Sequence, residues 1–400
     1  MALAGISPRI GGVSFHSACD IDRTCQQVLL AHPDHSRAEH CFGDLCARPP
    51  LEVQRTLRSV LSTFQKRARR ASTPATVARL SELWLKEAMQ ALSQWQPTRA
   101  DACFCVRHQR DCPMFPATSG RYHLEISGIN CQPWSCAGLR LGWLDDRSLP
   151  CLVLIRLILA AEPHGVCLEC TPGFDFKGLS SLLQDKYTGD FAVTSPLDFG
   201  LPVARRRMYM YFDLHGSPPA RLGLADMLPV SRRALALKPV DFLVARPQEV
   251  EGYYRKLLGK RARPPVPRRR AIQETTSLTL ADVLCSGMWK RYEGHRARVV
   301  ARMGDGCHIV DINHNPEYRG PPSDARVPTI MRSSTLVAVF PSAASDRLVL
   351  PTELVAMHGL ELPAQLMSRL PDRRLVSLVG NSMHVAQVGC FLQFALAMRG

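Results

Sequence analysis

The stretch Gly-Ile-Asn-Cys-Gln-Pro-Trp-Ser, residues 128–135, lies between two segments of contrasting pattern. Before it, residues 122–127 alternate apolar and polar side chains, which predicts a short strand. After it, the apolar run over residues 148–161 predicts a helix. An open α/β sheet carries its chemistry in such loops, at the carboxyl ends of its strands. Cys131 is therefore a candidate nucleophile. The alternative is a buried structural thiol, which is the commoner state of a free cysteine.

The composition narrows the class of protein. The chain has 400 residues, of which 46% are hydrophobic, and this is enough for two domains with buried cores. Its 50 Lys and Arg against 35 Asp and Glu give a net charge of +15. This charge favours a polyanionic partner, with nucleic acid ahead of an acidic membrane surface.

The cysteines and the N-terminus indicate the compartment. The 15 cysteines are scattered, and residues 1–8 lack the basic and apolar regions of a secretory signal. We therefore expect free thiols in a reducing compartment, in a protein that is not secreted and lies in the nucleus of a eukaryote or otherwise in the cytoplasm. The most apolar run, residues 151–161, is too short to span a membrane.

Two short segments near the start end in acidic residues. Residues 13–22 predict a strand that ends at Asp20 and Asp22, and residues 40–45 predict a second strand that ends at Asp44. Acidic residues at such strand ends bind ribose hydroxyls in nucleotide-binding α/β folds; the alternative for Asp22 is a cap of the following helix. No Gly-x-Gly loop precedes them, so we expect the sequence to begin inside a fold whose first strand is missing.

Residues 49–100 have a helical pattern. Two amphipathic helices are predicted over residues 51–70 and 76–94, separated by a segment that ends in Pro74. The basic run over residues 66–70 is expected to be a solvated helix end, and a contact with phosphates is the alternative.

Four soft metal ligands follow within ten residues: Cys103, Cys105, His108 and Cys112. Cysteine and histidine are the ligands of tetrahedral zinc sites. The spacing is not one of the common ones, so the alternative of surface and core thiols without a shared ion stays open.

A carboxylate, Glu169, lies near the end of the apolar segment 165–170, 38 residues after Cys131. That separation is about one strand–helix–strand unit, so we expect both residues on neighbouring strand ends at one edge of a parallel sheet. The alternative is a glutamate that only ends a strand. A basic triplet, residues 205–207, then opens a further strand over residues 203–212.

From about residue 214 the alternation of strands and helices is lost. Residues 216–219 predict a linker, and residues 253–270, rich in Arg, Lys and Pro, predict a long basic loop that binds phosphates or serves as a nuclear-localisation signal. Residues 289–292 interleave aromatic and basic side chains, as nucleic-acid surfaces and packed edges both do. Residues 348–360 predict a turn and a helix, and residues 380–382 are expected to cap a last helix over residues 385–398.

In this order, these pieces resemble the cytosine-5 DNA methyltransferases. Residues 128–135 are similar to the family's Pro-Cys-Gln-Pro-Phe/Trp-Ser catalytic loop, with Ala137-Gly138-Leu139-Arg140 and Asp146-Arg147 beyond it. Leu168-Glu169-Cys170 stands where the family has Glu-Asn-Val, and residues 203–207 stand where it has Gln-x-Arg-x-Arg. Residues 347–359 resemble the segment that follows the target-recognition domain, and residues 380–383 resemble the Gly-Asn-Ser/Ala motif.

The resemblance implies a fold, a reaction and a site. The fold is an α/β sheet of the S-adenosylmethionine-dependent, Rossmann-like methyltransferase type, with a second, smaller target-recognition domain. The reaction transfers a methyl group from S-adenosylmethionine to C5 of a flipped cytosine in DNA through a covalent cysteine adduct. The implied catalytic residues are Cys131, Glu169, Arg205 and Arg207, and the implied cofactor-binding residues are Asp20, Asp44, Asn381 and Ser382.

The resemblance also implies domain boundaries. A catalytic domain is expected over residues 1–213, with a helical insertion at about 46–120. A DNA-binding, target-recognition domain is expected over residues 214–335, and residues 336–400 are expected to return to the catalytic domain. These boundaries follow from the family's order of motifs.

The sequence departs from the family at Asn130, at Cys170 and Thr171, and at Val203. It also lacks the Phe-x-Gly-x-Gly loop that holds the methionine end of the cofactor, which is expected either upstream of Met1 or to be lost. Two alternatives therefore stay open. One is a catalytically impaired, methyltransferase-like protein that binds DNA. The other is an RNA cytosine-5 methyltransferase, because a tRNA-modifying branch shares these motifs.

Overall fold

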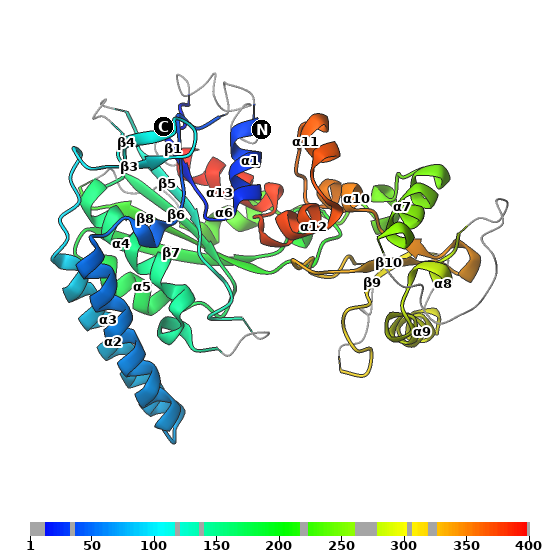
Figure 1. Cartoon of the computed structure of the whole chain (residues 1–400), viewed down its shortest axis with the longest axis horizontal. Coiled ribbons are helices and arrows are strands. Elements are labelled where there is room, and N and C mark those ends of the chain that lie inside the picture. Colours follow the sequence, from blue (N-terminus) through cyan, green and yellow to red (C-terminus); the bar gives the residue numbers. More distant parts are fainter. Residues whose placement is uncertain are drawn as a thin grey trace. The chain divides into compact units, whose positions relative to one another are not determined.

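The computed structural model describes residues 13–32, 37–116, 121–135, 140–216, 223–260, 278–301, 306–318 and 326–397 (Figure 1). The chain divides into two compact units. The first comprises residues 1–194, 206–231 and 388–400, and the second comprises residues 195–205 and 232–387. Residues 336–387, expected in the catalytic domain, are thus grouped with the second unit, in which residues 336–339 pair with a strand at 308–311.

The first unit holds two four-stranded sheets. One has the order β5-β6-β8-β7, formed by Leu124–Gly128, Gly165–Cys170, Arg207–Leu214 and Tyr187–Thr194. β5 and β6 are parallel, and β8 is antiparallel to both of its neighbours. The other has the order β1-β2-β3-β4, formed by Ser17–Cys19, His40–Phe42, Ala102–Cys105 and Arg110–Pro113, with β1 and β2 parallel. Helices interleave with these strands, so the predicted α/β class is confirmed.

The strand and helix that follow the Cys131 loop agree with their predicted ranges. β6 spans the predicted residues 165–170 and is buried at every position, as expected for an interior strand without polar alternation. α4, Leu149–Ala161, is apolar on almost all faces and buries eight side chains against the first unit's core. A proline in its first turn and a left-handed Glu162 after its last residue fix its two ends.

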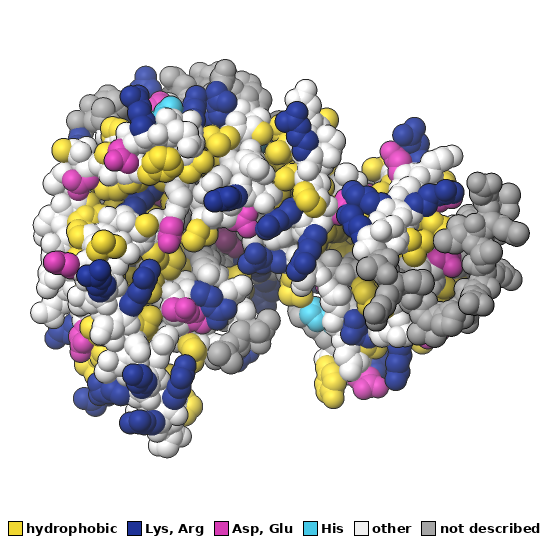
Figure 2. Space-filling view, viewed as in Figure 1, with side chains coloured by type: hydrophobic (Ala, Val, Ile, Leu, Met, Phe, Trp, Pro, Cys, Tyr) yellow, Lys and Arg dark blue, Asp and Glu magenta, His cyan; other side chains and the backbone are white. Residues whose placement is uncertain are grey.

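The predicted helical insertion is a hairpin of α2, Leu51–Arg70, and α3, Pro74–Ser93. α2 buries one stripe at the helical spacing: Val53, Leu57, Leu61 and Phe64. α3 buries Trp84, whose indole N–H donates to the carbonyl of Trp143 at 2.8 Å. The basic residues that end α2 are exposed, as expected for a solvated helix end, and Figure 2 shows basic side chains gathered over this end of the hairpin. The remaining helices of this unit are α1, Arg23–Ala31, α5, Phe176–Leu183, α6, Leu224–Ser231, and most of α13, Val385–Ala397.

The second unit packs helices around an antiparallel sheet of order β11-β10-β9, formed by Arg347–Leu348, Leu336–Val339 and His308–Asp311. Its helices are α7, Pro247–Gly259, α8, Leu280–Val283, α9, Ser286–Val300, α10, Pro351–Met357, α11, Ala364–Arg369, and α12, Asp372–Asn381. The predicted basic loop over residues 253–270 was wrong for residues 253–259, which complete α7, because Tyr254 and its neighbours pack into the core of this unit. Residues 261–270 of that segment lie outside the described residues.

The aromatic and basic segment 289–292 lies on α9. Tyr292 is buried there, and its hydroxyl donates to Asp346 Oδ2 at 2.6 Å. Arg291 donates to the carbonyl of Ile312 at 2.7 Å. For these two residues the segment is a packed edge, which was the alternative to a nucleic-acid surface.

The end of α12 differs from the prediction. Residues 380–382 were expected to cap the last helix, whereas Asn381 is the last residue of α12 and Ser382 is its C-cap. α13 begins only at Val385. Residues 372–396 are long and apolar enough, by composition alone, to cross a membrane, but 39% of their most apolar window is buried, and core helices of soluble proteins pass the same test.

Candidate active site

Cys131 and Glu169 lie at the ends of two neighbouring parallel strands. Gly128, the last residue of β5, stands opposite Glu169 in β6, and the N–H of Ile129 donates to the carbonyl of Glu169 at 2.8 Å. Cys131 follows two residues later. The prediction that both residues lie at one edge of the sheet, one strand–helix–strand unit apart, is confirmed.

Among the described cysteines near this edge, Cys131 is the accessible one. It is half-buried, whereas Cys151, Cys167 and Cys170 are fully buried. Burial raises the pKa of Cys167 to about 12 and holds the pKa of Cys170 well above its usual range, with the Glu169 charge adding to both shifts. Since the thiolate is the nucleophile, these two buried sulfurs are unsuited to the role.

The loop around Cys131 is held by local hydrogen bonds and by an aromatic cluster. Asn130 Oδ1 accepts from the N–H of Gln132 at 3.2 Å, which closes an Asx turn where the family has proline. The N–H of Trp134 donates to the carbonyl of Cys131 at 3.1 Å. The Trp134 ring packs edge-on against Trp143 and Phe174, with ring centroids 5.3 and 4.6 Å away. The loop is thus fixed on both sides of the sulfur.

An arginine braces the same loop, and sequence reasoning assigned it no role. Arg147 Nη1 donates to Gln132 Oε1 at 2.7 Å. Its Nε and Nη2 donate to Oδ1 and Oδ2 of the buried Asp145 carboxylate at 2.8 and 2.6 Å. These hydrogen bonds lower the pKa of Asp145. The only sequence signal was the position of Arg147 in the extended loop motif.

Glu169 and Arg207 form a nearly buried ion pair. Arg207 Nε lies 3.0 Å from Glu169 Oε1, and the two side chains are 14% and 10% exposed. Arg207 begins β8, which pairs with β6, so both partners stand on strands of one sheet. Sheet register therefore presets this pair, and rigid placement on strands is what a catalytic carboxylate requires.

Arg205 is placed differently from Arg207. It belongs to the second unit, is 3% exposed, and donates to the carbonyls of Ile330, Gly380 and Ser382 at 3.1, 3.1 and 2.8 Å. A Cβ on Gly380 would lie 2.3 Å from the backbone nitrogen of Arg332, so only glycine fits there. The structure thus ties Arg205, predicted as a catalytic residue, to the Gly-Asn-Ser segment as a brace.

Replacing Arg205 with alanine is expected to destabilise the second unit by about 3 kcal/mol, because buried hydrogen bonds to a charged donor contribute ~1.5–3 kcal/mol each. Chemical denaturation followed by circular dichroism measures this change. Arg206→Ala is the matched control, since Arg206 is exposed and adjacent in sequence. Equal denaturation midpoints for the two variants would refute the bracing role.

Asp20 and Asp44 follow the parallel strands β1 and β2, in which Ser17 pairs with His40. Asp20 Oδ1 accepts from the N–H of Asp22 at 2.8 Å, and Asp44 Oδ1 accepts from the N–H of Cys46 at 2.9 Å. Asp22 itself caps α1 through the N–H of Thr24, which was the alternative to a ribose contact. The carboxylates of Asp20 and Asp44 thus stand at one edge of this sheet.

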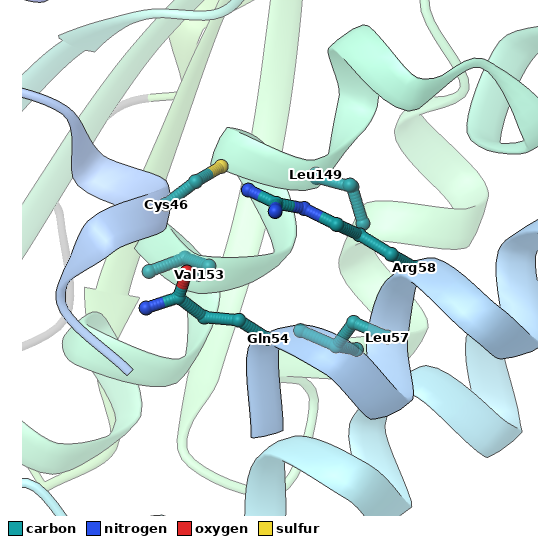
Figure 3. Close-up of a pocket in the computed structure, with 6 residues that line it drawn as sticks. All are labelled: Cys46, Gln54, Leu57, Arg58, Leu149 and Val153. Carbon is teal, nitrogen blue, oxygen red and sulfur yellow. The ribbon is translucent and has the colours of Figure 1, made fainter. Parts of the chain in front are cut away.

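Figure 3 shows a small pocket beside Cys46, which follows Asp44 by two residues in the sequence. The side chains that line it come from α2, α4 and the turn after β2: Cys46, Gln54, Leu57, Arg58, Leu149 and Val153. It has room for about one water molecule and therefore does not hold a nucleoside.

The other predicted cofactor residues belong to the second unit. Asn381 is exposed at the end of α12. Ser382 accepts from Arg205 through its carbonyl, and its hydroxyl donates to the carbonyl of Val379 at 3.1 Å. These contacts of Ser382 are structural.

Three of the four predicted zinc ligands come together, and the fourth is exchanged. Cys105, His108 and Cys112 offer ligand atoms within 4.8 Å of one another, together with His40. Cys103 was wrong as a member of this group. His40 lies 65 positions before Cys105, so no local spacing in the sequence could have found it.

Comparison with known proteins finds distant relatives. No protein-family model matches the chain. The type II methyltransferase M.NgoBI of Neisseria gonorrhoeae is 26% identical over 170 residues, which cover 38% of this chain and 50% of that protein. The type II methyltransferase M.HaeII of Haemophilus aegyptius is 31% identical over 124 residues, 28% and 39% of the two chains. The chain spans about half the length, or less, of the curated relatives it matches.

Solved structures give similar results. The crystal structure of the Schizosaccharomyces pombe Dnmt2 methyltransferase aligns over 69% of this chain and 77% of its own, with 16% identity and a TM-score of 0.44. A putative DNA modification methyltransferase encoded within a prophage of Escherichia coli aligns over 69% and 79%, with 15% identity and a TM-score of 0.42.

Proposed function

Because the chain is distantly homologous to the cytosine-5 DNA methyltransferases, we propose that it transfers a methyl group from S-adenosylmethionine to C5 of cytosine in DNA. The observation that carries the proposal is the edge at which Cys131, Glu169 and Arg207 meet. It combines an accessible thiol, a nearly buried carboxylate and its arginine partner on adjacent strands.

The residues present fit one end of the methyl donor. Asp20 and Asp44 offer carboxylate oxygens at one edge of the β1–β2 sheet, where ribose hydroxyls and an adenine amine find acceptors. These two residues would hold the adenosine end of S-adenosylmethionine. The bound donor supplies an electrophilic methyl group.

The chain's own residues would activate the base. C5 of cytosine is a weak nucleophile, so the Cys131 thiolate adds to C6 and converts the ring to an enamine with electron density at C5. Glu169 holds a proton at N3, which withdraws charge as the sulfur adds. Arg207 keeps the Glu169 carboxylate oriented. Loss of the C5 proton after methylation then expels the Cys131 sulfur.

In duplex DNA, C5 and C6 of a stacked cytosine are inaccessible to an enzyme's side chains. The target base must therefore be flipped out of the helix. The net charge of +15 supports binding to the DNA backbone. We assign DNA binding to the second unit. Contacts with phosphates would supply affinity, and contacts with base edges would supply any sequence specificity.

The test is methyl transfer from radiolabelled S-adenosylmethionine to duplex DNA and, separately, to folded tRNA. Nuclease digestion of the labelled product is expected to yield 5-methyldeoxycytidine. Label recovered as 5-methylcytidine from tRNA alone would support the RNA alternative. Salt-sensitive DNA binding without transfer to either substrate would support the catalytically impaired alternative and overturn the proposal.

A further inference from the structure

We propose that His40, Cys105, His108 and Cys112 bind one zinc ion. They offer one ligand atom each, and all four atoms lie within 4.8 Å of one another. Two thiolates and two neutral imidazoles balance the charge of Zn²⁺ and are a common donor set of structural zinc sites. The site lies in the β1-β2-β3-β4 sheet, outside the catalytic edge.

The spacing of the donors matches tetrahedral zinc. His108 Nδ1 lies 3.5 Å from Cys105 Sγ and 3.3 Å from Cys112 Sγ. Zinc–sulfur bonds of about 2.3 Å and zinc–nitrogen bonds of about 2.0 Å, at tetrahedral angles, place sulfur and nitrogen about 3.5 Å apart. His108 Nδ1 thus lies from both sulfurs at the distance that a shared ion would impose.

Thiols without a metal account poorly for the same geometry. The single lone pair of His108 Nδ1 accepts a proton from one thiol only, yet two sulfurs flank it at comparable distances. Cys105 and Cys112 are also buried. Beside them, His40 Nδ1 is buried and has no hydrogen-bond partner among the described residues. A shared metal ion would coordinate both sulfurs, His108 Nδ1 and one ring nitrogen of His40.

Hydrogen bonds and backbone conformation around the four ligands favour metal binding. The N–H of Cys41 donates to Cys105 Sγ at 3.3 Å, a contact that stabilises a thiolate. Arg107 Nη1 donates to the carbonyl of Ala38 at 2.7 Å, which ties the ligand turn to the segment before His40. Gln109, between the last two ligands, has a φ of +54°, which a side chain rarely adopts unless the fold imposes it.

The ion would join distant parts of the chain. It would connect the start of β2, at His40, to the β3–β4 hairpin that carries the other three ligands. β2 leads directly to Asp44, so the metal would stabilise the sheet that presents this carboxylate. Its role is structural, because all four positions are filled by protein donors.

The test measures zinc in the purified full chain, prepared under a non-thiol reductant, by elemental analysis and by titration of the metal-free protein against a chromophoric chelator. The wild type is expected to hold about one zinc per chain. Cys105→Ser, Cys112→Ser and His40→Ala are expected to weaken zinc binding at least ~100-fold, since even outer-shell changes cost ~10–100-fold.

Cys103→Ser is the matched control, because Cys103 lies on the same strand two residues from Cys105 but outside the group. It is expected to bind zinc as the wild type does. Zinc uptake lost in Cys103→Ser and kept in His40→Ala would overturn the ligand assignment. Wild-type protein that takes up no zinc would overturn the site.

A second measurement uses only the wild-type protein, so it tests the site even if the ligand variants fold poorly. In the wild type, zinc is expected to protect two thiols from a thiol-reactive dye under native conditions, and a chelator is expected to expose them. Cobalt substitution is expected to give the intense visible bands of a tetrahedral thiolate site. Unchanged thiol reactivity on chelation, or the weak spectrum of octahedral cobalt, would refute the proposal.

Discussion

Cys131→Ser is expected to lower the rate of methyl transfer to DNA by on the order of 10⁴-fold or more. A serine hydroxyl at this position is a far weaker nucleophile than a thiolate, and the enamine that activates C5 would not form. The loop should keep its shape, because its hydrogen bonds run through the backbone, Asn130 and Arg147 rather than through the sulfur.

Covalent trapping measures the step directly. With duplex DNA that contains 5-fluorocytosine, the fluorine blocks the final elimination, so the wild-type protein is expected to stay joined to the DNA through denaturing electrophoresis. Cys285→Ser, which alters an exposed thiol of the second unit, should trap as the wild type does. A trapped complex that persists in Cys131→Ser would disprove the nucleophile assignment.

Glu169→Gln is expected to lower kcat by about 10²–10⁴-fold, the usual contribution of a positioned acid or base, while DNA binding changes little. The amide keeps the size of the side chain but cannot deliver a proton to N3. It also leaves the nearly buried Arg207 without its anion. Steady-state kinetics with separate measurement of DNA affinity distinguishes the catalytic effect from a loss of binding.

Glu162→Gln is the matched control. Glu162 is paired with Lys186 on the surface, both side chains being nearly half exposed, and such pairs contribute about 0–1 kcal/mol. The kcat of Glu162→Gln is expected to stay within about twofold of the wild-type value. Loss of this surface ion pair costs little stability and leaves the positions of Cys131 and Glu169 unchanged. A denaturation curve for Glu169→Gln monitors folding. A kcat no lower than that of Glu162→Gln would remove Glu169 from the mechanism.

The sheet edge that carries Cys131 and Glu169 was largely predictable, because it depends on local pattern and one spacing. The burial of β6 and α4 follows from continuous apolar runs, and the 38 residues from Cys131 to Glu169 fit one strand–helix–strand unit. Parallel pairing then brings the two strand ends together, because such connections have a fixed hand. The ion pair with Arg207 needed only the next strand in the same sheet.

Two of the three arginines in the basic triplet, residues 205–207, have environments that the local pattern did not predict. Arg205 and Arg207 are two residues apart and looked equivalent in the sequence. Arg207 begins β8 and pairs with Glu169, whereas Arg205 precedes the strand and is surrounded by carbonyls of the second unit. The chain crosses between units at this point, which no local periodicity records.

The sequence by itself determined the α/β class, the helical insertion, the strand that carries Glu169 and the meeting of Cys131 with that strand. Only the tertiary structure decided that Arg147 braces the cysteine loop, that Arg205 is a brace, and that His40 rather than Cys103 joins the cluster of candidate metal ligands. The reason is physical. Periodicity encodes which face of an element is buried, but donors far apart in sequence meet only through strand register and loop closure, which the whole fold sets.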